Sequence, residues 1–313
     1  MSDTTTSLRR KTASAGDLQS VVRTMKAMAA SSIGQYEASV RALADYYRIV
    51  ELGLGACFRE QDGVRMAGGT KPATGMIGAV VFGSDQGLVG QFNDVIADYA
   101  IKTLATLPRN PQLWAVGERV HARLTDAGLP PVGLFAVPNS VKVITPLVGQ
   151  ILVETVTRRG PATGIPPTPS GFGEARRAGG DELSELHLFY NRPVSGATYE
   201  PVSQRLLPLD DAWRREISEH HWPTKNLPEA IGDTTTLRAL IREYLFVSLF
   251  RACAESLASE NASRLAAMQR ADKNIDELLE DLNGTFQRMR QSGIDAELFE
   301  VISGFEALVR SGQ

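Results

Sequence analysis

The chain has 313 residues, of which 43% are hydrophobic and 22% charged, with a formal net charge of -3. This composition is typical of a globular protein of about two domains, and the near-neutral charge gives no general reason to expect nucleic acid as a partner. Two cysteines, Cys57 and Cys253, stand far apart without a C-x-x-C pair, which argues against a disulfide framework or a zinc site.

Membrane-targeting features are also missing from the sequence pattern. The first residues, MSDTTT, lack the charged and then apolar regions of a signal peptide, and no run of about 18 apolar residues occurs. We therefore expect no direct membrane insertion, and membrane association only through a partner.

The first segment, residues 1–58, is expected to form one long amphipathic helix. Apolar and small residues recur at steps of three and four, which is heptad-like spacing. The stripe consists of Leu18, Val22, Met25, Ala29, Ser32, Tyr36, Ser39, Leu43, Tyr46 and Val50. Charged side chains such as Arg23 and Lys26 occupy the opposite face, and a linker rich in turn-forming residues, 59–75, closes the helix.

The middle of the chain, residues 76–210, alternates short apolar runs with helical patterns. Such alternation predicts a small, open and mostly parallel α/β sheet. We expect strands at 76–82, 112–117, 132–137, 186–190 and 202–207, with helices at 92–107, at 118–127 and from Thr145 onward, where Pro146 would take the first helical position. The segment 160–180 is rich in Pro and Gly and is expected to be an exposed, mobile insertion.

The last part, residues 211–313, is expected to form a C-terminal coiled-coil helix. No proline follows Leu237, Asp233 and the threonines after it are a plausible cap, and small residues dominate 252–267, which favours close approach of a second helix. Long helices at both chain ends can meet only as an antiparallel pair. The predicted fold class is therefore α/β plus a long antiparallel coiled coil, with paired N- and C-terminal helices and a central open Rossmann-like α/β domain.

Motifs that would carry catalysis are absent from the sequence. There is no P-loop string, and the glycine-rich segment 83–90 has no Lys and no dinucleotide fingerprint, so we expect a structural turn built on Asp85, Gly87 and Gly90. His220 and His221 are adjacent and are a weak candidate for a metal site. We expect no catalytic residue, no cofactor and no metal.

Three segments together resemble the gamma subunit family of F-type ATP synthases. They are 17–30 (DLQSVVRTMKAMAA), 84–93 (SDQGLVGQFN) and 256–308, which begins SLASENASRLAAMQRADKN and closes with ELFEVISGFEAL. Three departures suggest a divergent branch, of the kind of the alternate ATPases: the segment 9–14 is not the usual R-I-K-S string, Val89 replaces the usual Cys, and the insertion at 160–180 is unusual.

The resemblance implies a non-catalytic central rotor shaft on the cytoplasmic face of the cell membrane. It would transmit torque between a membrane c-ring driven by ions and a catalytic ring of alpha and beta subunits, with an epsilon subunit as a further partner. By position, the resemblance assigns partner contacts to two groups of residues. Arg23, Met25 and Lys26 would face the beta subunits, and a second group would face the loops and sleeve of the ring: Arg264, Arg290, Gln291, Asp295 and Glu300.

The apolar residues near the C-terminus, among them Ile294, Leu298, Phe305 and Leu308, would form a tip that turns inside that sleeve. Two alternatives remain open from the residues themselves. One is an α/β nucleotide-binding protein with a helical extension, and the other is a coiled-coil scaffold unrelated to ATP synthesis.

Overall fold

The computed structural model describes residues 4–61, 76–157, 183–194, 198–209, 211–219, 222 and 234–311. Most of the expected linker, the whole 160–180 insertion, Asp233 and the His220–His221 pair lie outside the described residues. The chain divides into two compact units: a terminal unit, Met1–Ala29 with Arg264–Gln313, and a sheet unit, Ala30–Ser263. Two long helices, α1 (Thr5–Gln61) and α6 (Thr234–Ser311), each contribute to both units.

The sheet unit is built on five strands in the order β3-β2-β1-β4-β5. The strands are β1 (Met76–Phe82), β2 (Gln112–Val116), β3 (Gly133–Phe135), β4 (Leu183–Val194) and β5 (Thr198–Leu207). The first four pair in parallel and β5 pairs antiparallel to β4. The mostly parallel sheet predicted from the alternating pattern is confirmed, with an antiparallel hairpin at one edge.

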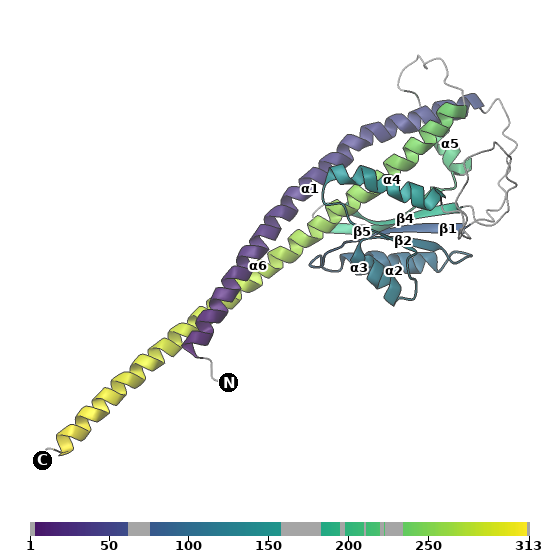
Figure 1. Ribbon diagram of the computed structural model, residues 1–313. Helices are drawn as coiled ribbons and strands as arrows, with labels where there is room; N and C mark the ends of the chain where they lie inside the picture. The colour runs from purple at the N-terminus through teal and green to yellow at the C-terminus, as the bar shows by residue number, and fades with distance from the viewer. Residues whose placement is uncertain are drawn as a thin grey trace, which may run out of the picture. The chain divides into compact units, whose positions relative to one another are not determined.

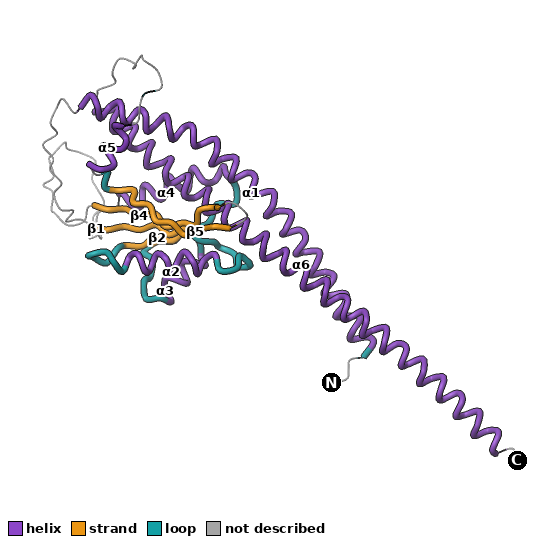
Figure 2. The backbone as a smooth tube through the Cα atoms, turned by 180° about the vertical axis from the view of Figure 1, so that it is seen from behind, coloured by secondary structure: helices purple, strands orange, loops and turns teal. Residues whose placement is uncertain are grey.

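Helices cover both faces of this sheet. One face carries α2 (Phe92–Leu104) and α3 (Glu118–Asp126), and the other carries α4 (Val141–Thr157) and α5 (Asp211–Glu219), together with the sheet-unit parts of α1 and α6 (Figure 1). The view from behind shows the same two layers (Figure 2). Because successive side chains of a strand point to opposite faces, β1 supplies Ala79 and Val81 to one core and Val80 and Phe82 to the other.

The terminal unit is an antiparallel pair of helices. Helix α1 starts where the Thr4 hydroxyl accepts a hydrogen bond from the Ser7 amide at 3.2 Å, which is an N-terminal cap. The Arg9 guanidinium lies 5.2 Å from the centre of the Phe286 ring, whereas Lys26 is paired with Asp272, so the two segments run in opposite directions. The paired helices at the chain ends are therefore confirmed.

The face that α1 buries differs in part from the predicted stripe. Val22, Ala29, Tyr36 and Val50 are buried as expected, but Leu18 is 54% exposed and Tyr46 is 42% exposed. The buried positions from the start of the helix recur every seven residues: Leu8, Ala15, Val22, Ala29 and Tyr36. The other row of the predicted stripe is covered only in part: Met25, Ser32 and Ser39 are half-buried, and its two ends, Leu18 and Tyr46, are exposed.

Two further expectations about helices were wrong. Helix α4 begins at Val141, not at Thr145, and Pro146 lies inside it, because Ile144, Val148 and Ile151 are fully buried on one face and extend the packing. The range 211–313 does not form a single C-terminal helix either. It contains the separate helix α5 before α6 begins at Thr234.

The small residues of α6 also pack against the sheet, in addition to the helix contact expected from the sequence. Ala252, Ala254 and Ala258 belong to the core cluster of the sheet unit, with strand residues such as Val80 and Leu188. They let α6 lie close to the sheet as well as to another helix.

Candidate partner-binding surfaces

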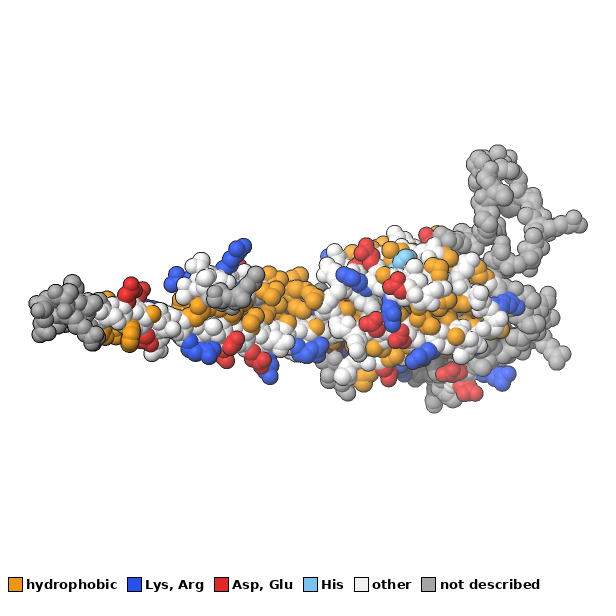
Figure 3. Space-filling model, turned by 90° about the horizontal axis from the view of Figure 1, so that it is seen from below, with side chains coloured by type: hydrophobic (Ala, Val, Ile, Leu, Met, Phe, Trp, Pro, Cys, Tyr) orange, Lys and Arg blue, Asp and Glu red, His pale blue; other side chains and the backbone are white. Residues whose placement is uncertain are grey.

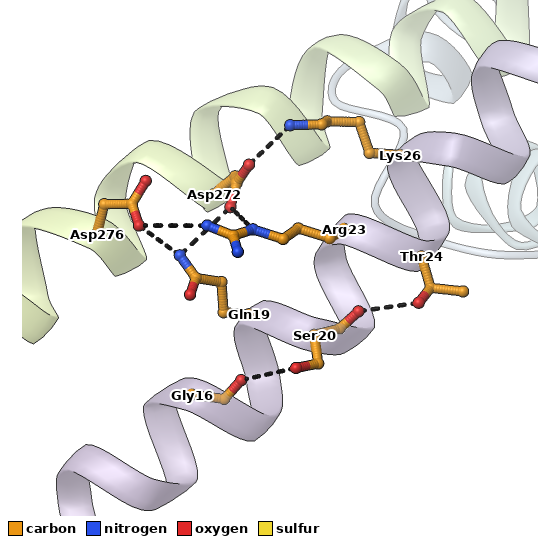
Figure 4. Close-up of polar contacts among 8 residues, drawn as sticks. All are labelled: Gly16, Gln19, Ser20, Arg23, Thr24, Lys26, Asp272 and Asp276. Atoms are coloured by element: carbon orange, nitrogen blue, oxygen red, sulfur yellow. Dashed lines mark hydrogen bonds and ion pairs between the residues drawn. The ribbon is translucent and has the colours of Figure 1, made fainter.

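An ionic cluster joins the two helices of the terminal unit (Figure 4). The Lys26 Nζ lies 2.7 Å from Asp272 Oδ2, and the Arg23 Nε lies 3.2 Å from Asp272 Oδ1. Arg23 also approaches Asp276 Oδ1 at 3.6 Å, and the Gln19 amide donates to Asp276. Asp272 thus collects two cations from α1, and two of the predicted partner-binding residues already have a partner within the chain.

The cluster affects the protonation of Asp272. The hydrogen bond from Lys26, with the further contribution of Arg23, lowers the pKa of Asp272 below its ordinary value. Its side chain is only 13% exposed, whereas that of Arg23 is 57% exposed. The carboxylate is therefore charged at neutral pH and fixes the two cations, while the Arg23 guanidinium keeps much of its surface in solvent.

Met25 lies beside the buried seam of the same helix pair. It is half-buried against a small cluster of Val22, Met268 and Ile275. The sequence prediction singled out Met25 as a contact residue but missed three apolar neighbours that face solvent: Leu18, Val21 and Met28, exposed by 54%, 55% and 66%. Their spacing in the heptad pattern was visible in the sequence, but it did not reveal which row would be covered.

The C-terminal part of α6 is a single helix whose side chains all face solvent as far as they are described. Every residue from Arg290 to Ser303 is exposed, and this range holds four of the predicted partner-binding residues: Arg290, Gln291, Asp295 and Glu300. The fifth, Arg264, is only half-exposed. The side chains of Phe305 and Leu308 lie outside the described residues.

Large apolar side chains are concentrated in the same range. Ile294, Leu298, Phe299, Val301 and Ile302 are between 49% and 73% exposed. Figure 3 shows apolar and acidic side chains together on this stretch, next to the grey C-terminal end. Exposed apolar residues crowded onto one stretch of a helix are typical of a surface that binds another protein.

The predicted structural turn follows β1. The Asp85 carboxylate accepts hydrogen bonds from the Glu118 amide at 3.0 Å and from the Val137 amide at 2.9 Å, so it ties together the segments that follow β1, β2 and β3. Gly90 has a φ of 57°, but the other residue with a left-handed backbone in this turn is Leu88, at 63°. Gly87, the other glycine named for this turn, does not have a positive φ.

Polar groups at the carboxyl end of the sheet, where open α/β sheets bind ligands, form hydrogen bonds with one another. Ligands of open α/β sheets bind where the strand order reverses, here between β1 and β4. At this place the Asn191 amide donates to the Phe92 carbonyl at 3.0 Å, and the Ser84 amide is held by Asn93 at 2.9 Å. Polar groups that could hold a phosphate are thus engaged in internal hydrogen bonds.

Two other kinds of site are absent from the described residues. No group of three or more metal-ligating side chains is found in the part of the chain that the structure describes. Among the same residues, no helix has the length and apolar character needed to cross a membrane.

Comparison with known proteins shows which family this chain resembles. A family model described as "ATP synthase" matches residues 4–308. The ATP synthase gamma chain of Desulfitobacterium hafniense is 25% identical over 301 residues, which cover 96% of this chain and 98% of that protein. The gamma chain of Clavibacter sepedonicus is 29% identical over 96% of this chain and 97% of its own length. That of Syntrophus aciditrophicus is 35% identical over 131 residues, a match that spans 42% of this chain and 44% of that relative.

Solved structures share the fold at lower identity. The central stalk and c-ring structure of the Tetrahymena thermophila mitochondrial ATP synthase contains a chain that matches with a TM-score of 0.53 and 19% identity, over 80% of this chain and 99% of that one. A chain of the Euglena gracilis mitochondrial ATP synthase matches with a TM-score of 0.51 and 15% identity, over 91% and 97% of the two chains.

Proposed function

This chain belongs to the ATP synthase gamma chain family, and from that premise we propose that it is the central rotor shaft of a rotary ATP synthase. In this role it transmits torque between a membrane ring driven by ions and a catalytic ring of alpha and beta subunits. The observation that carries the proposal is the terminal unit, in which two helices are locked by ion pairs and one of them continues as an exposed, apolar-rich helix.

The role requires asymmetry in the shaft. A pair of helices with different sequences presents a different surface to each subunit of a surrounding ring, so chemically identical sites are biased toward different conformations. Turning the shaft then changes which site is favoured. A uniform contact would shift no population, because only a difference in affinity between two states moves an equilibrium.

We assign the partner-binding surfaces from the side chains that are exposed to solvent. The Arg23 side chain is 57% exposed, and Leu18, Val21 and Met28 are exposed on another side of the same helix. With Met25 and Lys26, these residues form the proposed contacts with the beta subunits. Arg290, Gln291, Asp295 and Glu300 accompany the exposed apolar residues of α6 and would contact the loops and sleeve of the ring. Arg264, which is half-exposed, would contribute near the start of the terminal unit.

The chain itself carries no catalysis in this proposal. The alpha and beta subunits would hold the nucleotides, and the sheet unit would contact the epsilon subunit and the c-ring. The assembly would lie peripherally on the cytoplasmic face of the membrane. We propose the segments 1–58, 76–210 and 211–313 as the functional parts of the chain, the first and last forming the shaft.

The two alternatives find less support. A nucleotide-binding role would need the carboxyl ends of β1 and β4, where Asn191 and Asn93 are engaged in internal hydrogen bonds. An unrelated coiled-coil scaffold would have no need for the sheet unit. The match to ATP synthase gamma chains spans nearly the whole chain, and so includes the sheet unit.

Rotation tests the proposal directly. An Asp126→Cys variant places a probe on an exposed residue at the end of α3, and both native cysteines are buried. Burial also raises the pKa of the Cys253 thiol, which keeps it unreactive toward a thiol-directed probe. The tagged chain should co-purify with alpha and beta subunits, and ATP should drive rotation of the probe when the ring is fixed to a surface. Consistent absence of alpha and beta subunits, or a probe that never turns, would overturn the proposal.

A further inference from the structure

Within the sheet unit, three side chains of α6 lie one helical turn apart and bond to β4 and to the glycine-rich turn. The Ser259 Oγ donates to the Asn191 carbonyl at 2.9 Å, and the Ser263 Oγ donates to the Val89 carbonyl. One turn earlier, the Glu255 Oε2 is in an ion pair with the Arg192 Nε at 3.5 Å. Because residues four apart share one face of a helix, Glu255, Ser259 and Ser263 form a single row, which we call the polar ladder.

The groups that receive the ladder are themselves fixed. Asn191 uses its side-chain amide to hold the Phe92 carbonyl, and the Phe92 amide in turn donates to the Val89 carbonyl at 3.3 Å. The ladder therefore joins α6 to the end of β4, to the glycine-rich turn and to the start of α2. Asn191 is fully buried and Ser259 is only 1% exposed, whereas the Arg192 side chain at the other end of the row is 43% exposed.

The ladder supplies what the apolar contacts beside it cannot. The apolar contacts beside the ladder include Ala252, Ala254 and Ala258 together with the bulkier Leu249 and Leu257. Hydrophobic contact has no preferred direction, so it fixes the rotation of the helix less sharply than hydrogen bonds do. Hydrogen bonds weaken steeply when their angle falls below about 120°. A helix that slips by one residue moves about 1.5 Å along its axis and turns by about 100°, which would break every contact of the row at once.

We propose that the polar ladder locks α6 against rotation about its own axis relative to the sheet, and that torque passes between the sheet and α6 through it. This inference rests on the proposed function. It makes Ser259 and Ser263 positioning residues for coupling, with no contact to nucleotide or to the transported ion.

A matched set of serine variants tests the ladder. The double variant Ser259→Ala with Ser263→Ala removes both hydroxyls. Ser256→Ala is the control, because Ser256 is equally buried on the same helix and its hydroxyl has no hydrogen-bond partner among the described residues. Single variants of Ser259 and Ser263 accompany the pair in case the double variant does not assemble.

Two quantities are measured on the full chain in its assembled complex. The first is amide hydrogen exchange of the segment 84–93, which should accelerate by roughly fivefold for each hydroxyl removed, since one such hydrogen bond contributes about that factor to an opening equilibrium. The second is the number of ions moved per ATP hydrolysed in vesicles, followed with a pH-sensitive dye and, in parallel, with labelled Na⁺. This ratio should fall in the ladder variants while ATP hydrolysis continues, and Ser256→Ala should leave both quantities unchanged.

The possible results separate the two proposals. If the ladder variants and Ser256→Ala behave alike in exchange and in ion movement, the ladder is wrong and the rotor function is untouched. If the unmodified chain recovers no alpha and beta subunits and moves no ions, the proposed function fails, and exchange of 84–93 in the isolated full chain still decides whether the ladder holds α6. Loss of assembly in the single variants with normal coupling in the residual complexes would also overturn the ladder.

Discussion

Two stretches of the same helix have opposite environments. Every residue of α6 from Ala252 to Ser263 is buried, and every residue from Arg290 to Ser303 is exposed. The buried stretch contains Glu255, Glu260 and several serines, whereas the exposed stretch contains Ile, Leu, Phe and Val side chains. The two stretches of this continuous helix are similarly rich in apolar residues, so hydrophobicity alone does not tell the buried stretch from the exposed one.

The comparison shows that each stretch is shaped by what surrounds it in the working protein. Burying a charge is costly unless it is paired, and Glu255 meets that condition, since the Arg251 Nε lies 2.7 Å from one of its oxygens. Small side chains let α6 lie close to the sheet, and their hydroxyls give the contact a direction. The exposed apolar stretch has no such cover among the described residues, as expected of a surface that a partner completes.

A proline between the two stretches should have the largest effect. Ala266→Pro lies in the helix interior, where proline removes a hydrogen bond and clashes with the preceding turn, at a cost of ~3 kcal/mol or more. We expect the variant to lose coupling or to fail to assemble with alpha and beta subunits, as measured by co-purification and by ion movement per ATP. Ala266→Gly, which costs only about 1 kcal/mol in a helix interior, is the control. Normal coupled turnover in the proline variant would contradict a stiff shaft.

A pair of identical substitutions tests the comparison itself. Leu257 is 4% exposed in the buried stretch and Leu298 is 58% exposed in the other. Leu257→Ala should lower the free energy of unfolding by about 2–5 kcal/mol, because it leaves a cavity in a packed core. Leu298→Ala should change the stability of the isolated chain by no more than about 0.5 kcal/mol.

Binding to the ring of alpha and beta subunits should show the opposite order: among correctly folded chains, Leu298→Ala should weaken binding more than Leu257→Ala. Leu298→Ala should weaken association with the alpha and beta ring although the isolated chain unfolds normally in denaturant. Binding by titration of the two purified components measures this. If Leu298→Ala destabilises the isolated chain as much as Leu257→Ala does, the exposed stretch is covered by this chain and the comparison is wrong.

Loosening the turn that receives the buried stretch should have an intermediate effect. Asp85→Ala removes an acceptor of two backbone amides, those of Glu118 and Val137, and leaves them without their charged partner. We expect a loss of about 1–3 kcal/mol in the free energy of unfolding, measured by denaturant titration. Asp85→Asn should recover part of it, because its single amide oxygen can accept from only one of the two segments. An unchanged midpoint in Asp85→Ala would show that the turn holds without the carboxylate.

Much of the fold could be predicted because its signals are local. The range 76–82 was predicted as a strand and is β1, and the helix expected from 92 is α2, since runs of buried apolar residues and helical spacing are written in consecutive residues. The start of α4 was misplaced because a local rule for Pro146 competed with burial of Ile144 on the sheet, and burial prevailed. Local sequence preference determines where a helix begins only when tertiary packing does not favour a different start.

The contacts between distant segments could not be predicted in the same way. Ser263 and Val89 are 174 positions apart, and Ser259 and Asn191 are 68 apart, so no window of sequence contains either pair. The sequence did hold one unused signal, the four-residue spacing of Glu255, Ser259 and Ser263 within a run of small residues. From the sequence, this run was interpreted only as a sign of close helix packing, and the polar row was not identified. The predicted partner-binding residues remain predictions, because their partners are other chains.

The smallest effect concerns the ion pairs that join the helices of the terminal unit. Asp272→Asn weakens the attraction to Lys26 and Arg23 and should lower the thermal unfolding temperature slightly at neutral pH and low salt. The pKa of Asp272 is lowered in the folded chain, so its contribution is fully present above its ordinary pKa and is lost as the pH falls through the lowered value. The difference between parent and variant should therefore be constant near pH 7 and shrink from about pH 4 downward. It should also shrink at 1 M salt, where the screening length falls to about 3 Å. Glu277→Gln is the matched control, since Glu277 pairs with Lys273 on its own helix and joins nothing across the pair. A difference for Asp272→Asn that persists unchanged at pH 3 and in high salt would mean that shape, and not charge, holds the two helices together.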